Sequence, residues 1–345
     1  MVGVGLVFAT LHGQPASPEA ARKLQERLKR FPEADANRDG VLTEEEARAH
    51  QKSARKGKAA KTTENAAAPT TPSVANVSYG PHARNVLDVW QAKAERPAPA
   101  LIFFHGGAFK AGDKANVLAR PIFAECLTAG ITVISANYRF TSDAPFPAQM
   151  HDGARVVQFV RSKAKEWNLN PERIALSGTS AGATLALWIS LHNDFADPSS
   201  KDVVARLSTR VTCASPHNGT AGLEIAYFKE QAGITKLGGG IYQLFGVKSQ
   251  EELETPDKRA LTREASAVLH ATRDDPPLFL TYAGNPEEAP FAADAPQNAW
   301  IHHVSLGVPL KKRYDQLGLE CEFYYKSKAP AAGAEIAFLK KHLLR

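Results

Sequence analysis

The segment Gly178-Thr179-Ser180-Ala181-Gly182 constrains the fold of this chain more than any other part of the sequence. The residues before it, 173–177, predict a short buried strand, and the apolar residues 183–189 after it predict a helix. A sharp turn of small residues between a strand and a helix is typical of a nucleophile elbow, which exposes its central serine at the top of a sheet. The glycines let the backbone bend tightly without a clash of Cβ atoms. The segment therefore predicts an α/β sheet with the Ser180 hydroxyl at its edge.

A second turn of small residues follows another strand. Residues 98–104 are an apolar run that predicts a buried strand, and this run leads directly into His105-Gly106-Gly107. In acyl-transfer hydrolases the N–H groups of such a turn donate to the developing oxyanion, together with the N–H of the residue after the nucleophile. We therefore expect Gly106, Gly107 and Ala181 to form an oxyanion hole.

These two motifs resemble those of the esterase/lipase branch of the α/β-hydrolases, the group that includes hormone-sensitive lipase and carboxylesterases. The resemblance continues through Asn137-Tyr138-Arg139, the segment 145–149 and Asp152, and it covers residues 76–345. It implies an α/β-hydrolase fold, with a mostly parallel eight-stranded sheet and helices on both faces. It also implies that His105 orients the turn and that Asp152 belongs to a structural ion pair.

A serine nucleophile of this kind needs a base and an acid, which follow it along the chain in this family. Residues 276–282 predict strand seven, and the resemblance places the acid a few residues later, where Glu287 stands. Glu288 and Asp294 are the alternatives. The two glutamates can also be interpreted as solvated loop charges.

The expected histidine is missing from its usual place. Residues 319–325 predict strand eight, but the loop after it, 326–335, contains no histidine. His302 and His303 lie between the acid loop and the next helix, on the edge where active sites of open α/β sheets form. We expect His302 or His303 to act as the base. The alternative is that one imidazole packs on Trp300 and the other faces water.

Three functions are compatible with these residues. The resemblance implies a serine carboxylic-ester hydrolase that forms an acyl-enzyme on Ser180 and needs no cofactor for catalysis. Its substrates would be short-chain esters or acetyl and feruloyl groups on polysaccharides. The missing histidine supports the alternative of a catalytically impaired binding protein on the same fold. A serine peptidase or amidase is the third hypothesis.

The segment 35–46 fits the twelve-residue loop of an EF-hand at every diagnostic position. A glycine, Gly40, stands at the sixth position, where the loop bends sharply. The oxygen donors are Asp35, Asn37, Asp39, the carbonyl of Val41, Thr43 and Glu46. We therefore expect a helical EF-hand module over residues 17–54 that binds Ca²⁺ in a structural or regulatory role. No second loop is present, so dimerisation through this module is one expectation.

The remaining segments predict that the protein is exported and that a linker joins the EF-hand module to the hydrolase domain. Residues 1–16 resemble the remnant of a signal peptide, which predicts a secreted or periplasmic protein. Residues 55–75 predict a flexible basic linker, and residues 217–275 a helical insertion over the site. No stretch reaches the 18 apolar residues of a membrane span. The net charge of +6 is concentrated around the linker, and no nucleic-acid motif is present.

Overall fold

The computed structural model describes residues 24, 26, 28, 31–35, 39–43, 46, 47 and 68–344. The chain divides into two compact units, residues 1–66 and 67–345. The predicted signal-peptide remnant, 1–16, and residues 55–67 of the predicted linker lie outside the described residues. No helix among the described residues is long and apolar enough to cross a membrane.

The larger unit is built on one eight-stranded sheet with the order β1-β2-β4-β3-β5-β6-β7-β8. The strands β1 and β2 run antiparallel to their neighbours, and the pairs from β4 to β8 are parallel. The bounds are β1 (Val74–Ser78), β2 (Val86–Trp90), β3 (Ala98–Phe104), β4 (Thr132–Ala136), β5 (Leu169–Thr179), β6 (Cys213–His217), β7 (Leu278–Thr281) and β8 (Cys321–Tyr324). The predicted mostly parallel eight-stranded sheet is therefore confirmed.

Helices cover both faces of the sheet. They are α3 (Pro121–Thr128), α4 (Ala148–Ser162), α5 (Ala181–Leu191), α11 (Val308–Leu317) and α12 (Ala334–Leu343). Phe123 of α3 and Phe338 of α12 share one buried cluster with Phe103 of β3. Leu185 of α5 belongs to the cluster on the other face, together with Leu176 of β5. Because alternate residues of each central strand enter the two clusters, β3 is apolar and buried along its whole length.

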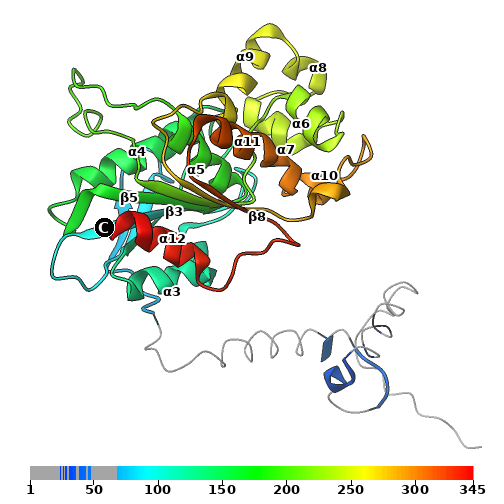
Figure 1. Ribbon diagram of the computed structural model, residues 1–345, viewed down its shortest axis with the longest axis horizontal. Coiled ribbons are helices and arrows are strands. Elements are labelled where there is room, and N and C mark those ends of the chain that lie inside the picture. Colours follow the sequence, from blue (N-terminus) through cyan, green and yellow to red (C-terminus); the bar gives the residue numbers. More distant parts are fainter. Residues whose placement is uncertain are drawn as a thin grey trace, which may run out of the picture. The chain divides into compact units, whose positions relative to one another are not determined.

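A group of short helices lies between β6 and β7 in the sequence. These are α6 (Ile225–Ala232), α7 (Gly239–Phe245), α8 (Gln250–Leu253), α9 (Pro256–Glu264) and the 3₁₀ turn η3 (Ala267–Leu269). Figure 1 shows them gathered beside α10 (Gln297–Trp300) and α11, away from α3 and α12. Further 3₁₀ turns are η1 (Pro32–Ala34), η2 (Lys114–Ala119), η4 (Pro286–Glu288) and η5 (Val304–Leu306).

The larger unit begins earlier than the boundary expected at residue 76. Its first residue is Ala67, and β1 already pairs with β2 from Val74. The carbonyl of Thr70 accepts a hydrogen bond from Trp90 Nε1 at 3.3 Å. The segment before residue 76 has few apolar residues, so the sequence did not predict that it leads into an edge strand. Backbone groups of this segment, rather than large apolar side chains, hold it to the sheet.

Candidate active site

Ser180 lies at the turn between β5 and α5 and has a strained backbone. Its φ is +53° and its ψ is −118°, a conformation rare for a residue with a side chain. The Ser180 N–H donates to the carbonyl of His217 at 2.9 Å, which ties the turn to β6. At Gly182 a Cβ atom would lie 2.1 Å from the carbonyl oxygen of Phe104, so only glycine allows β3 and α5 to approach this closely. Strain at a site held this firmly is typical of a functional turn.

His302 is the histidine that the structure brings to the serine. Its Nε2 lies 2.8 Å from Ser180 Oγ, within hydrogen-bonding distance. The backbone at His302 is fixed, because its carbonyl accepts from the Ala283 N–H at 2.9 Å and Val304 returns a bond to Ala283 at 2.9 Å. Burial lowers the pKa of His302 below the ordinary value for histidine. The imidazole is therefore held neutral beside the serine, with a lone pair available to accept a proton.

His303 points away from the serine and is buried in the protein. Its Nδ1 accepts from the N–H of Ser305 at 3.2 Å and caps η5. Its Nε2 then carries the proton and donates to the carbonyl of Asn285 at 2.9 Å. The ring also meets Phe291 edge-on, at 4.9 Å between centroids. These contacts anchor the loop that carries His302, so His303 is placed as a support and not as a base.

The three candidate acids do not bond to His302 in the described part of the chain. Glu287 and Glu288 lie in η4, where Glu288 Oε1 accepts from Asn285 Nδ2 at 3.2 Å and approaches Lys326 Nζ at 3.5 Å. The side chains of Glu287, Glu288 and Asp294 are exposed to solvent. The loop after β7 turns into η4 here, which directs the carboxylates of Glu287 and Glu288 to the surface.

The His105-Gly106-Gly107 turn lies against Ser180. A Cβ atom at Gly106 would come within 3.4 Å of the Cβ of Ser180, and Gly107 has a φ of +121° that favours glycine. Among the described residues, the N–H groups of Gly106 and Gly107 make no hydrogen bond to the protein. The N–H of Ala181 is the first of α5 and has no partner within the helix. All three donors are thus available to an oxygen atom at this position.

The buried side chain of His105 orients this turn. It is fully buried, its Nε2 accepts from Arg84 Nη2 at 3.3 Å, and its Nδ1 donates to the Gly106 carbonyl at 2.8 Å. Burial, with help from the nearby Arg84 charge, lowers the pKa of His105 to about 4. Tyr138 stacks on the ring at 4.4 Å and donates to the His105 carbonyl at 2.6 Å. These contacts keep His105 neutral and immobile.

The ion pair expected from Asp152 is present next to this turn. Both oxygens of Asp152 accept from Arg139, at 2.7 Å from Nη2 and 2.9 Å from the backbone N–H. Asp152 is only 5% exposed. The pair therefore fixes the segment after β4, which carries Tyr138, onto α4.

A cavity of about 390 Å³ opens onto Ser180 and His302. Its apolar wall comes largely from the predicted insertion, 217–275, with one residue from before it and one from after it. These wall residues are Phe109, Leu223, Ile241, Leu244 and Ile301. Asn218, which follows β6 directly, also lines it, and its buried Oδ1 has no hydrogen-bond partner among the described residues. Asn218 was not among the residues predicted from the sequence, although its place directly after a buried strand, at the carboxyl edge of the sheet, is typical of active-site residues.

The predicted calcium loop is described in part, with Asn37 outside the described residues. Asp35 Oδ2 accepts from the Gly40 N–H at 2.9 Å, and Asp39 Oδ1 accepts from the Val41 N–H at 2.8 Å. Asp35 is 8% exposed, and its other oxygen, Oδ1, is buried and has no hydrogen-bond partner among the described residues. A buried, unpaired carboxylate oxygen is costly unless a cation or another donor reaches it.

The end of this loop forms a helix cap. The N–H and hydroxyl of Thr43 donate to Glu46 Oε2 at 3.0 and 2.7 Å, and the Glu46 N–H donates back to Thr43 Oγ1 at 3.2 Å. Leu42 is buried with Ala34 and Ala47. The loop therefore bends back on itself, with the Asp35 carboxylate turned toward Gly40 and the Glu46 carboxylate toward Thr43.

Proteins of similar sequence include several esterases. The BD-FAE family model matches residues 87–291, a span that includes Ser180 and the Gly106 turn but ends before His302. The esterase LipQ of Mycobacterium tuberculosis is 27% identical over 229 residues, which cover 65% of this chain and 51% of LipQ. LipM of the same organism, a probable carboxylic ester hydrolase, is 26% identical over 227 residues, or 62% of this chain and 48% of LipM. The chain thus spans about half the length of these curated relatives.

Solved structures share the fold at lower identity. A truncated carbohydrate esterase from gut microbiota is 20% identical with a TM-score of 0.61, and the match covers 82% of this chain and 100% of that one. The acetyl ester-xyloside bifunctional hydrolase of Caldicellulosiruptor lactoaceticus is 20% identical with a TM-score of 0.55, over 75% of this chain and 84% of that one. These likenesses support the α/β-hydrolase architecture of the sheet and helices. Since the family model matches more than half of the sequence, the chain belongs to the BD-FAE family.

Proposed function

We propose that this protein is a serine carboxylic-ester hydrolase with Ser180 as nucleophile and His302 as general base. The observation that carries the proposal is the 2.8 Å contact between His302 Nε2 and Ser180 Oγ, at the foot of the cavity. Nucleophile and base within hydrogen-bonding reach are the signature of activated serine catalysis. Membership of a family with esterase relatives supports the same chemistry.

The steps follow from the positions of the groups. Ser180 Oγ attacks the carbonyl carbon of the ester while its proton passes to His302 Nε2. The carbonyl oxygen becomes negative and accepts from the N–H groups of Gly106, Gly107 and Ala181, each worth about 3 kcal/mol in related oxyanion holes. The imidazolium then protonates the departing alcohol, leaving an acyl group on Ser180. Water, deprotonated by His302, releases the acid and restores the serine.

The cavity favours a small acyl group and a polar alcohol. Its volume of about 390 Å³ and its wall of Leu223, Ile241 and Leu244 suit a short apolar chain. The unpaired Oδ1 of Asn218 can accept a hydrogen bond from a hydroxyl group of the substrate. The solved neighbours named as carbohydrate and acetyl ester hydrolases support short acyl esters on polysaccharides as the substrate class.

Hydrolysis of an aryl acetate by the wild type and by Ser180→Ala tests the proposal. We expect turnover that the substitution abolishes, and covalent labelling of the wild type by a fluorophosphonate. Equal, near-background rates and no labelling would instead indicate a binding protein on this fold. Faster cleavage of an acyl anilide than of the matching ester would favour the peptidase or amidase hypothesis.

We further propose that the segment 35–46 binds Ca²⁺ as a single EF-hand. The observation that favours it is the buried Oδ1 of Asp35, which has no hydrogen-bond partner in the described part of the chain. Asp35, Asn37, Asp39, the Val41 carbonyl, Thr43 and Glu46 would hold the ion, which would supply charge neutralisation and cross-link the loop. Calorimetric titration with calcium tests this proposal. We expect one binding site in the wild type and a large loss of calcium affinity in Glu46→Gln. Absence of binding heat, with an unchanged melting temperature, would refute it.

A further inference from the structure

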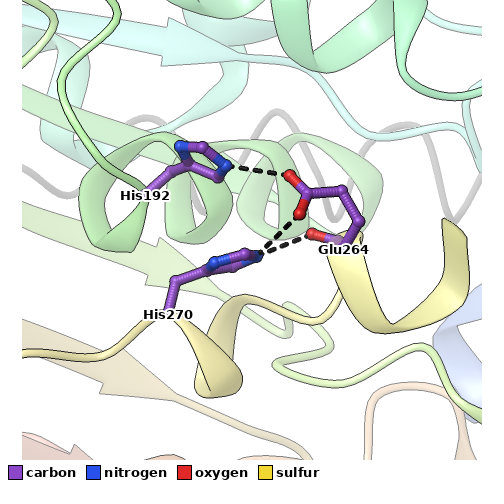
Figure 2. Close-up of side chains that lie close together, drawn as sticks. All are labelled: His192, Glu264 and His270. Carbon is purple, nitrogen blue, oxygen red and sulfur yellow. Dashed lines mark hydrogen bonds and ion pairs between the residues drawn. The ribbon is translucent and has the colours of Figure 1, made fainter. Parts of the chain in front are cut away.

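A cluster of metal-binding side chains lies away from the serine. His192, at the end of α5, Glu264, the last residue of α9, and His270, just after η3, converge so that one ligand atom of each lies within 4.8 Å of the others. Figure 2 shows both imidazoles pointing toward Glu264, with His192 meeting its carboxylate and His270 lying between its carboxylate and its carbonyl. The cluster joins the helix that follows the nucleophile to the helical segment between β6 and β7.

The hydrogen bonds of His192 leave a place for a cation. Its Nδ1 lies 3.2 Å from the carbonyl of Asn193, which can only accept, so Nδ1 carries a proton. In the neutral ring Nε2 is then an acceptor, and it lies 2.8 Å from the Glu264 carboxylate, a second acceptor. Two acceptors at this separation share a proton, and a metal ion that replaced the proton would move the two atoms about 0.5 Å further apart, to the spacing of tetrahedral zinc ligands. Donation of the second ring N–H to a backbone carbonyl is also the usual support of a histidine that ligates a metal.

His270 can join the same ion without leaving a buried group unpaired. Its Nε2 lies 2.7 Å from the Glu264 carbonyl and 4.0 Å from Glu264 Oε2. The same carbonyl also accepts from Trp188 Nε1 at 2.8 Å, so it keeps a partner if the imidazole turns to a metal. A rotation of His270 brings its Nε2 beside the carboxylate, and the ring proton that Nε2 now donates to the carbonyl moves to Nδ1, so that Nε2 presents a lone pair to the metal.

We propose that His192, Glu264 and His270 form a site for a divalent transition metal of the zinc class. Two imidazoles and one carboxylate are a known zinc donor set, which water completes to four ligands. Soft and borderline metals prefer imidazole, whereas calcium and magnesium prefer all-oxygen sites. The side chains are 15%, 46% and 20% exposed in chain order, so an ion and its water can reach them from solvent.

The ion would brace one wall of the substrate cavity. The segment between Glu264 and His270 bonds to the chain before α6: Ser266 Oγ accepts from the Leu223 N–H at 2.8 Å, and the Val268 N–H donates to Ala221 at 2.9 Å. Leu223 lines the cavity. Fixing Glu264 and His270 to the end of α5 therefore stabilises that wall, while the ion itself stays at the opposite end of the helix from Ser180.

Calorimetric titration of the metal-stripped full chain with ZnCl₂, in buffer saturated with calcium, tests the site. We expect one zinc ion per chain, and a melting temperature raised by about 5 °C when zinc is 100-fold above its Kd. His270→Gln and Glu264→Gln should each weaken zinc binding by more than about 100-fold, beyond what a group outside the ligand set typically controls. A tetrahedral absorption spectrum with Co²⁺ would identify the coordination.

His151→Gln is the matched control. This histidine lies beside Trp188, 6.4 Å away between ring centroids, but is not one of the three converging ligands. It should leave zinc affinity unchanged. The proposal is overturned if the wild type shows no binding heat and no thermal shift, or if His270→Gln and Glu264→Gln bind zinc like the wild type. Because binding can be measured in Ser180→Ala, the result does not depend on ester hydrolysis.

Discussion

Replacing His302 with glutamine removes the group that we propose accepts the proton of Ser180. The imidazole Nε2 is 2.8 Å from Ser180 Oγ, and no second histidine among the described residues bonds to this oxygen. A positioned general base contributes about 10²–10⁴-fold to the rate. Because this base also returns the proton to the leaving alcohol, we expect the upper part of that range, a loss of about 10³–10⁴-fold in kcat/KM. This loss corresponds to about 4–5 kcal/mol of transition-state stabilisation.

The assay is steady-state hydrolysis of an aryl acetate by His302→Gln, Ser180→Ala and the double variant. Since the two groups act as one unit, the double variant should lose hardly more than either single variant. The pH profile gives a second measurement. Only neutral His302 accepts a proton, and burial lowers its pKa, so kcat/KM should fall on the acidic side with a midpoint below the ordinary 6.5. An activity loss under tenfold in His302→Gln, or a midpoint above 6.5, would refute the assignment.

Three further predictions concern the surroundings of this pair. Glu287→Gln and Glu288→Gln should each retain kcat/KM within about threefold of the wild-type value, because neither carboxylate bonds to His302. A loss of about 10³-fold in either variant would instead identify that residue as the acid. Gly107→Ala should lower kcat by about 10²–10³-fold, because the new Cβ would lie 2.1 Å from the Ala111 carbonyl oxygen and displace the N–H donor. Unchanged kinetics would show that the Gly107 N–H does not belong to the oxyanion hole. Asp152→Asn should lower the free energy of unfolding by about 2–4 kcal/mol, measured by urea denaturation, because it breaks the pair with Arg139; a change below 0.5 kcal/mol would contradict this.

Local patterns were sufficient for the central sheet. The apolar run 98–104 predicted a buried strand, and β3 spans Ala98–Phe104, because a strand buried on both faces needs apolar residues at every position. The strand before Ser180 was predicted at 173–177, whereas β5 begins at Leu169. Leu169 pairs with Ala98 of β3, a contact between distant segments that local sequence does not report.

Neither the acid nor the base could be assigned from the local sequence, because both depend on how the loop after β7 folds. The spacing after strand seven pointed to Glu287, but the loop closes into η4 and leaves its side chain in solvent. Between His302 and His303 the sequence could not choose, because adjacent residues share one local pattern. The choice depends on long-range contacts: Asn285 holds the ring of His303, and this directs His302 toward Ser180.

The place of the proposed base in the chain indicates which property of a serine site is constrained: the geometry at the serine, and not the loop that carries the histidine. The family pattern puts the histidine after strand eight, but the segment after β8 supplies Glu335, which bonds to His217 Nε2 at 2.8 Å on the α12 side of the sheet. His302 instead comes from the loop after β7, whose backbone extends that strand through the bridge between Ala283 and His303. Loops after neighbouring parallel strands end at one edge of the sheet, so several of them can reach the same serine. The proposed mechanism requires a distance and an orientation at Ser180 Oγ, and a loop after β7 that holds His302 Nε2 2.8 Å from this atom can supply them as well as a loop after β8.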